Sequence, residues 1–181
     1  MTTDASQLQK IVTEKIGEIK NLTMNVMPVK VGAIAKSHFQ DNFRKSGFVN
    51  NGLQSWIPAK RLSGKGKKSA YKTLLSGRNH LFSGISYTPG QGKVMIENRV
   101  TYAIVHNEGY SGVQYVRPHK SGRLEAMSLK GRKRMRVGGS NISGFSRRMK
   151  IPKRQFIGES AELNKKIEDK FDSEVAKIIK S

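Results

Sequence analysis

The sequence predicts an α+β fold in which a small antiparallel sheet is packed by an N-terminal helix pair and a C-terminal helix, with a long basic loop or hairpin insert. Apolar residues recur at helical spacing near both ends of the chain, and hairpin signals occupy the middle. Because helices and strands come in separate runs, α+β is favoured over a parallel α/β sheet. The 181 residues fit a single domain over 1–181, with residues 110–150 as an insert within it.

The N-terminal part is expected to form two helices. Apolar residues at helical spacing predict the first over residues 4–22: Leu8, Ile11, Val12, Ile16, Ile19 and Leu22. Pro28 suits the first turn of a second helix, which is expected to end before Gly47. Its apolar face repeats in steps of four residues, at Val31, Ala35, Phe39 and Phe43.

The next stretch, residues 50–61, is predicted to be irregular, with a turn at Asn51-Gly52. Pro58 excludes a helix there, and Trp56 is expected in the core. Residues 60–72 are rich in Gly, Lys and Ser, which predicts a mobile basic loop.

Strands are predicted in the middle of the chain. The segments GISYT (84–88) and KVMIEN (93–98) flank a glycine-containing loop and indicate a hairpin. TYAIVHN (101–107) is expected to be a third strand, and VQYVRP (113–118) a fourth. After an extended IPKRQFIG (151–158), a final helix is expected, with Ser160 as N-cap and one apolar face packed on the sheet: Leu163, Ile167, Phe171, Val175 and Ile178.

Positive charge is concentrated in the interior of the sequence. The net charge is +21, yet the two terminal helical regions contain nearly balanced numbers of Lys and Asp/Glu. The insert at 110–150 holds eleven Lys/Arg and one acid, Glu125, and is expected to be flexible in the free subunit. Such charge favours an anionic partner over a merely solubilising surface. The candidate partner-facing or DNA-facing basic arm comprises Lys130, Arg132, Lys133, Arg134, Arg136, Arg147 and Arg148.

No catalytic, cofactor or metal site is expected. The chain has no cysteine, its four histidines are scattered, and no metalloprotease or phosphate-loop motif is present. The only tight polar group is His106-Asn107-Glu108, for which a turn-capping or interface role is favoured over a ligand or acid/base pair. The first ten residues do not resemble a signal peptide, and no apolar run would span a bilayer, so we expect a non-enzymatic, soluble protein.

Three segments together resemble the virion-morphogenesis, or tail-completion, family of tailed bacteriophages. The first contains a Phe-ending helix and a Trp-Pro turn, at Phe43, Trp56 and Pro58. The second contains a Leu-Leu-Gly-Leu segment and a Tyr-Ala-x-x-His-x-x-Gly end: Leu74, Leu75, Gly77, Leu81, Tyr102, Ala103, His106 and Gly109. The third is a Pro-x-Arg-x-Phe-x-Gly motif, at Pro152, Arg154, Phe156 and Gly158. Gln155 and Ile157 depart from the family's usual Pro and Leu, and the insert is unusually basic.

The resemblance implies a structural subunit that assembles as a ring, a hexamer, in the virion neck after synthesis in the host cytoplasm. Such a protein completes the head-proximal end of the tail and supports head–tail joining. Its partners would be tail terminator or tube proteins, head connector proteins and the genomic DNA in the channel, without a membrane. Arg154 is expected to pair with an acid on its own or the next subunit, while Gly109 and Gly158 are expected to permit backbone turns.

A cytoplasmic basic protein that binds nucleic acid, associated with ribosomes or the nucleoid, is the alternative. Its charge would fit, but residues 117–150 contain only one aromatic residue, Phe145, to stack on exposed bases. A basic nuclease lacks the acids needed to hold a metal ion. For the basic insert itself, an acidic protein surface and DNA both remain as partners.

Overall fold

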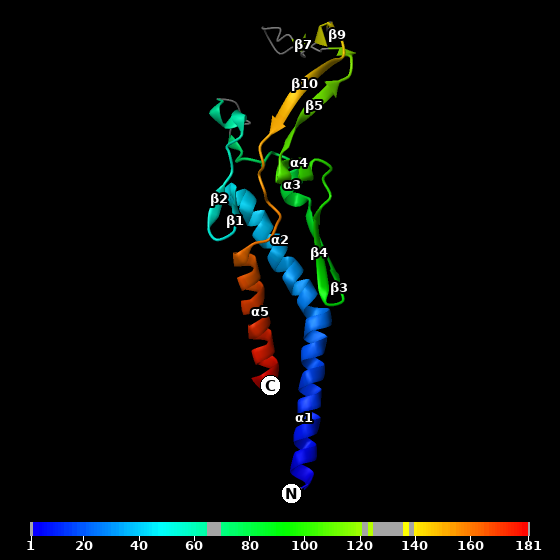
Figure 1. Cartoon of the computed structure of the whole chain (residues 1–181), viewed down its shortest axis with the longest axis vertical. Helices are drawn as coiled ribbons and strands as arrows, with labels where there is room; N and C mark the ends of the chain where they lie inside the picture. Colours follow the sequence, from blue (N-terminus) through cyan, green and yellow to red (C-terminus); the bar gives the residue numbers. More distant parts are fainter. Residues whose placement is uncertain (1, 65–69, 121–122, 125–135, 138–139, 181) are drawn as a thin grey trace, which may run out of the picture. The chain divides into compact units, whose positions relative to one another are not determined.

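The computed structural model describes residues 2–64, 70–120, 123–124, 136–137 and 140–180. Mixed helices and antiparallel strands confirm the predicted α+β class (Figure 1). The chain divides into two compact units, Met1–Glu108 with Pro152–Ser181, and Gly109–Ile151, which contains the predicted insert. The flexibility expected of the insert and of residues 60–72 stays a prediction, and residues 65–69 lie outside the described part.

Both predicted N-terminal helices form, and they run into one another. Helix α1, Thr2–Asn21, continues through a π-helical turn, Leu22–Val26, into α2, Met27–Lys45 (Figure 1). Pro28 lies in the first turn of α2, where its missing N–H costs nothing. The helix ends at Ser46, which has a left-handed backbone conformation. Its N–H donates to the carbonyls of Asn42 and Phe43 in the last turn.

Short hairpins follow α2. Strands β1, Gly47–Val49, and β2, Leu53–Ser55, pair across the turn at Asn51-Gly52, so the expectation that residues 50–61 are irregular is wrong for β2. Strands β3, Ile85–Gly90, and β4, Lys93–Asn98, confirm the predicted hairpin. A 3₁₀ turn, Lys60–Ser63, and a one-turn helix α3, His80–Ser83, lie in the connection between the hairpins.

The prediction of a third strand over residues 101–107 is wrong, because most of this segment lies in helix α4, Ala103–Glu108. A short apolar run does not reveal by its period whether it is strand or helix. Here the Asn98 side chain accepts a hydrogen bond from Val100 N at 3.1 Å, and Ala103 N bonds Val100 O at 2.9 Å, which turns the chain away from β4 into the helix.

Aromatic side chains from distant segments form the core of the first unit. The Phe43 ring makes an edge contact with Trp56 (ring centroids 5.6 Å apart) and a tilted contact with Phe156 (5.0 Å). Phe43 and Phe156 are almost fully buried, and Trp56 is also buried, which confirms its expected core position. The same cluster includes Leu81, Ile85, Ala103 and Leu163. The core therefore joins α2, both hairpins, α4 and the C-terminal helix.

The C-terminal helix α5, Ala161–Lys180, begins as predicted at Ser160, whose hydroxyl accepts a hydrogen bond from Leu163 N at 3.2 Å. Glu162 accepts two further bonds, from Asn51 N and Gly52 N in the β1–β2 turn. Beyond this first turn α5 packs along α2, which corrects the expectation that its apolar face lies on the sheet. The reason is that α2 itself covers β3 and β4.

The second unit is built on a long two-stranded ribbon. Strand β5, Tyr110–Val116, pairs with β10, Phe145–Ile151, in antiparallel register over seven residues of each strand. This confirms a fourth strand near 113–118, whereas the basic insert over 110–150 stays a prediction. Two-residue strands continue beyond it: β6, His119–Lys120, pairs with β9, Asn141–Ile142, and β7, Arg123–Leu124, pairs with β8, Arg136–Val137.

Truncating the central ring should destabilise the first unit strongly. Phe43→Ala removes the contacts with Trp56 and Phe156 and leaves a buried cavity. We expect a loss of about 3–5 kcal/mol in the free energy of unfolding, measured by urea denaturation. The control is Leu53→Ala, at a half-exposed position. A loss below about 1 kcal/mol for Phe43→Ala would contradict the central position of this ring.

The free energy of unfolding should fall in acid because the Glu174 carboxylate becomes protonated. Lys170 and Lys30 hold the pKa of its carboxyl at about 2, and the Lys30 contact (2.7 Å) joins α5 to α2. A carboxyl with a lowered folded-state pKa stabilises the fold above its unfolded pKa, and this contribution is lost as pH falls toward the folded pKa. The unfolding free energy should thus drop less between pH 5 and pH 2 in Glu174→Gln than in the wild type. Equal drops would contradict the assignment.

Candidate functional site

Three of the residues that carry the family resemblance, Phe43, Trp56 and His106, contact the extended segment Pro152–Gly158, which we call the clamped segment. Asn107 from α4 uses its side-chain oxygen to accept hydrogen bonds from Phe156 N (2.9 Å) and Ile157 N (3.0 Å). Asn42 from α2 donates to Phe156 O (3.1 Å). Trp56 Nε1 donates to Gln155 O (2.8 Å). Two side chains from helices and one from the residue after β2 therefore satisfy backbone groups that a sheet would otherwise pair.

Asn42 is the most enclosed of these polar side chains, with no exposed surface. Its oxygen also accepts a hydrogen bond from Val49 N in β1, at 3.2 Å. One amide therefore joins α2, β1 and the clamped segment. Sequence reasoning missed Asn42 and included Asn107 only within the polar group His106-Asn107-Glu108, because their partners lie 114 and about 50 residues away in the chain.

Arg154 is 8% exposed, and its Nε donates to Ile57 O at 2.9 Å. No carboxylate of the described residues forms an ion pair with it, so the expectation of an acid on its own subunit gains no partner there. Burial, and then the nearby Arg61 guanidinium, lowers the pKa of Arg154. An acid on another subunit stays a prediction.

His106 contributes through its backbone more than through its ring. Its carbonyl accepts a hydrogen bond from Arg154 N at 2.8 Å, and its ring makes an edge contact with Tyr102. Nδ1 is buried without a hydrogen-bond partner among the described residues. Burial, and then Arg154, lowers the pKa of His106, which favours the neutral ring near pH 7. Pro58 is exposed, just after the Trp56 anchor.

The two motif glycines, Gly109 and Gly158, differ in backbone conformation. Gly109 follows α4 with φ +80°, a left-handed conformation that glycine adopts without strain, as expected. Gly158 has no positive φ, so the expected turn requirement is wrong there. A Cβ at Gly158 would instead collide with the side-chain amide of Gln155. The colliding atoms are the far end of a flexible side chain that can move aside, so neither space nor backbone conformation requires glycine at this position.

The basic insert presents two arginines on an exposed ribbon. Arg147 on β10 lies opposite Gln114 on β5 and donates to its side-chain oxygen from Nε (3.1 Å) and a terminal nitrogen (2.9 Å). Arg148 lies on the opposite face, because neighbouring residues of a strand alternate. Of the predicted arm, Lys130, Arg132, Lys133 and Arg134 lie outside the described residues. Arg136 begins β8, and its side chain is not described.

The ribbon face that carries Arg148 also carries exposed apolar side chains that sequence reasoning missed. Val113 lies opposite Arg148 and is 63% exposed, and Tyr115 lies two residues further along β5 and is 61% exposed. Lys150 occupies the same face of β10. A period-two count along 113–118 would have placed Tyr115 with Val113. The pairing with β10, which brings in Arg148 and Lys150, depends on a register that a single strand does not reveal.

Comparisons with known proteins give no relative. No family model, curated protein or solved structure matches the chain. Among the described residues, no group of three or more acids and histidines could hold a metal ion. None of the described helices is sufficiently long and apolar to traverse a bilayer. The resemblance to the tail-completion family therefore rests on the residues quoted above alone.

Asn107 should be more important for stability than its sequence neighbours. Asn107→Ala leaves two backbone N–H groups of the clamped segment without their acceptor, which should cost about 2–4 kcal/mol in the free energy of unfolding. The adjacent Glu108→Ala removes an exposed ion pair with Lys153 and an exposed hydrogen bond from Asn107 Nδ2, and should cost less than about 1 kcal/mol. Equal effects of the two substitutions in urea denaturation would contradict the clamp.

Proposed function

We propose that this chain is a structural virion protein of the phage neck or tail, which completes the head-proximal end of the tail and supports head–tail joining as a ring. The observation that carries the proposal is the meeting of motif residues from three distant segments. The Phe43 ring contacts both Trp56 and Phe156, and all three belong to one hydrophobic cluster. Arg154 donates hydrogen bonds to the backbone carbonyls of His106 and Ile57. Four motif residues that are distant in the sequence, Phe43, Trp56, Arg154 and Phe156, thus lie in the buried part of the first unit.

The basic ribbon supports an assembly role in a different way. A two-stranded ribbon is only marginally stable when it stands alone in water, and its strands leave unpaired backbone groups on both edges. Here β5 and β10 also expose Val113, Tyr115 and Phe145. A surface of this kind, with Arg147 and Arg148 beside it, suits a partner that covers it. We propose an acidic surface of a tail or connector protein ahead of DNA, since joining is required in every virion.

No catalytic role is part of the proposal. Near the clamped segment, the Arg154 guanidinium donates to the carbonyl of Ile57, and the half-buried His106 ring makes an edge contact with Tyr102. The proposed contribution of the chain is therefore shape and charge: a rigid first unit that positions itself against other copies, and a basic insert that meets an anionic neighbour.

A second candidate, binding of nucleic acid, is favoured by one specific observation. Tyr115 is exposed on the same ribbon face as Arg148 and Lys150, so an aromatic ring and two cations lie together. Aromatic stacking beside basic groups is how many proteins hold single strands. Tyr115→Ala distinguishes the candidates in fluorescence anisotropy with a labelled single strand: a clear loss of affinity favours nucleic acid, and unchanged weak binding favours a protein partner.

The arm predicts a direct effect on joining. Changing Arg132, Lys133, Arg134 and Arg136 to Gln removes four charges from the insert, and we expect fewer joined, infectious particles, with a larger loss at high salt because the remaining charge contacts are screened. The variant is placed in the phage or prophage genome that encodes the chain, and joined particles are counted by electron microscopy.

A matched control removes four charges elsewhere. Lys45, Lys165, Lys166 and Lys180 are exposed on α2 and α5, and their change to Gln lowers net charge equally. The proposal expects joining to survive this control. Normal numbers of joined particles from the arm variant, with circular dichroism showing an intact fold in both, would contradict a joining role for the arm.

A further inference from the structure

An unpartnered apolar face follows α1. Leu8, Ile11, Val12 and Ile16 are spaced for one face of a helix, and each is 49–63% exposed. We call these four residues the α1 stripe. Four consecutive large apolar side chains on one helical face make a patch, unlike single exposed apolar residues, and such patches mark interaction sites.

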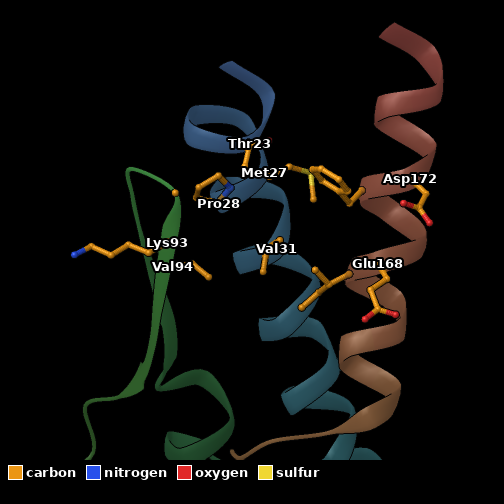
Figure 2. Close-up of a pocket in the computed structure, with 11 residues that line it drawn as sticks. Thr23, Met27, Pro28, Val31, Lys93, Val94, Glu168 and Asp172 are labelled. Carbon is orange, nitrogen blue, oxygen red and sulfur yellow. The ribbon is translucent and has the colours of Figure 1, made fainter. Parts of the chain in front are cut away.

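An unfilled apolar groove lies elsewhere in the same unit. It has a volume of about 500 Å³ and opens between the start of α2, the β3–β4 hairpin and α5 (Figure 2). Its apolar lining comes from all three elements: Met27, Val31, Val94, Ile167 and Phe171. In Figure 2, α2 forms the floor, with β4 on one side and α5 on the other. We call it the α2–α5 groove.

The rims of the groove carry opposite charges. Lys93, at one rim, extends from β4 away from α2, and Glu168 and Asp172 come from α5 at the other rim (Figure 2). No ion pair between described residues includes any of these three side chains. The groove therefore offers an apolar centre and two charged edges to an occupant.

The α1 stripe has edges of the matching kind. At 3.6 residues per turn, Lys15 lies within the face of the stripe and pairs with Glu18 at one edge, and Lys20 lies at the other edge. A helix laid along the groove can place Glu18 at the rim of Lys93 and Lys20 at the rim of Glu168 and Asp172. This is the recognition mode of an amphipathic helix in a groove.

Net charge also favours these two surfaces for contact between copies. Helices α1 and α5 each contain as many Lys as Asp and Glu, so the whole excess of +21 lies outside them. Copies of a strongly basic chain repel each other through their basic surfaces. A contact made by α1 against α5 and its neighbours avoids that repulsion.

We propose that the α1 stripe of one copy docks into the α2–α5 groove of another copy, so that copies join head to tail. The stripe cannot enter the groove of its own chain, because α1 runs without interruption through Leu22–Val26 into α2, which is the groove's floor. A contact between two different surfaces generates a ring if its rotation closes. The inference rests on the proposed function only in assuming that copies associate.

The test uses two full-length variants and sedimentation velocity over a range of concentrations. The stripe variant is Ile11→Gln with Val12→Gln, and the groove variant is Val94→Gln with Phe171→Gln. Each should raise the dissociation constant of the assembly at least about tenfold, as expected when interface anchors are removed. A control on the polar face of α1, Lys10→Gln with Thr13→Gln, should assemble like the wild type.

Mixing the two variants gives the sharpest result. The groove variant keeps its stripe and the stripe variant keeps its groove, so together they should form a 1:1 dimer that cannot grow. If the groove variant is destabilised in thermal melting, Glu168→Lys with Asp172→Lys replaces it, since both side chains are exposed.

Three outcomes would overturn the inference. If the groove variants assemble normally while the stripe variant does not, α1 pairs with α1 and the groove is not its site. If both variants assemble like the wild type, copies associate through other surfaces, and the proposed ring survives without this contact. A wild type that stays monomeric at all concentrations would instead count against the ring and this contact together.

Discussion

The structure of the first unit depends on the hydrogen bonds that the backbone of the clamped segment, Pro152–Gly158, makes with side chains from other parts of the chain. An extended chain buried between helices has backbone N–H and C=O groups that need partners. Asn42 and Asn107 supply three of them from two helices, and Trp56, just after β2, adds a fourth bond. Because this segment also delivers Phe156 to the core and leads into α5, the hydrogen bonds and the packing of the aromatic residues depend on each other.

Different parts of the chain pack the core and carry the net charge. Helix α2 lies between the β3–β4 hairpin and α5 and contributes Phe43 to the core and Val31 to the groove. The terminal helices carry balanced charge, whereas the insert carries eleven Lys/Arg with one acid. Neutral surfaces suit contact between identical copies, and a basic surface suits an unlike, anionic neighbour.

Long periodic segments could be predicted from the sequence, and contacts between distant residues could not. The apolar repeats of α1, α2 and α5, the Ser160 cap and the β3–β4 hairpin all follow from local pattern. The strand predicted over residues 101–107 is replaced by helix Ala103–Glu108, because so short a segment does not show whether its period is that of a helix or of a strand. The importance of Asn42 and Asn107, and the side of the ribbon on which Tyr115 lies, arise only when the chain folds.

The central claim is that copies of this chain close into a defined assembly. Native mass spectrometry of the purified full-length protein tests it most directly, since each copy contributes 20.2 kDa. The account predicts one dominant species whose mass is a fixed multiple of that value at all concentrations above the dissociation constant, with six copies as the resemblance implies. A protein that is monomeric throughout, or a continuous ladder of masses without a closed species, would contradict it.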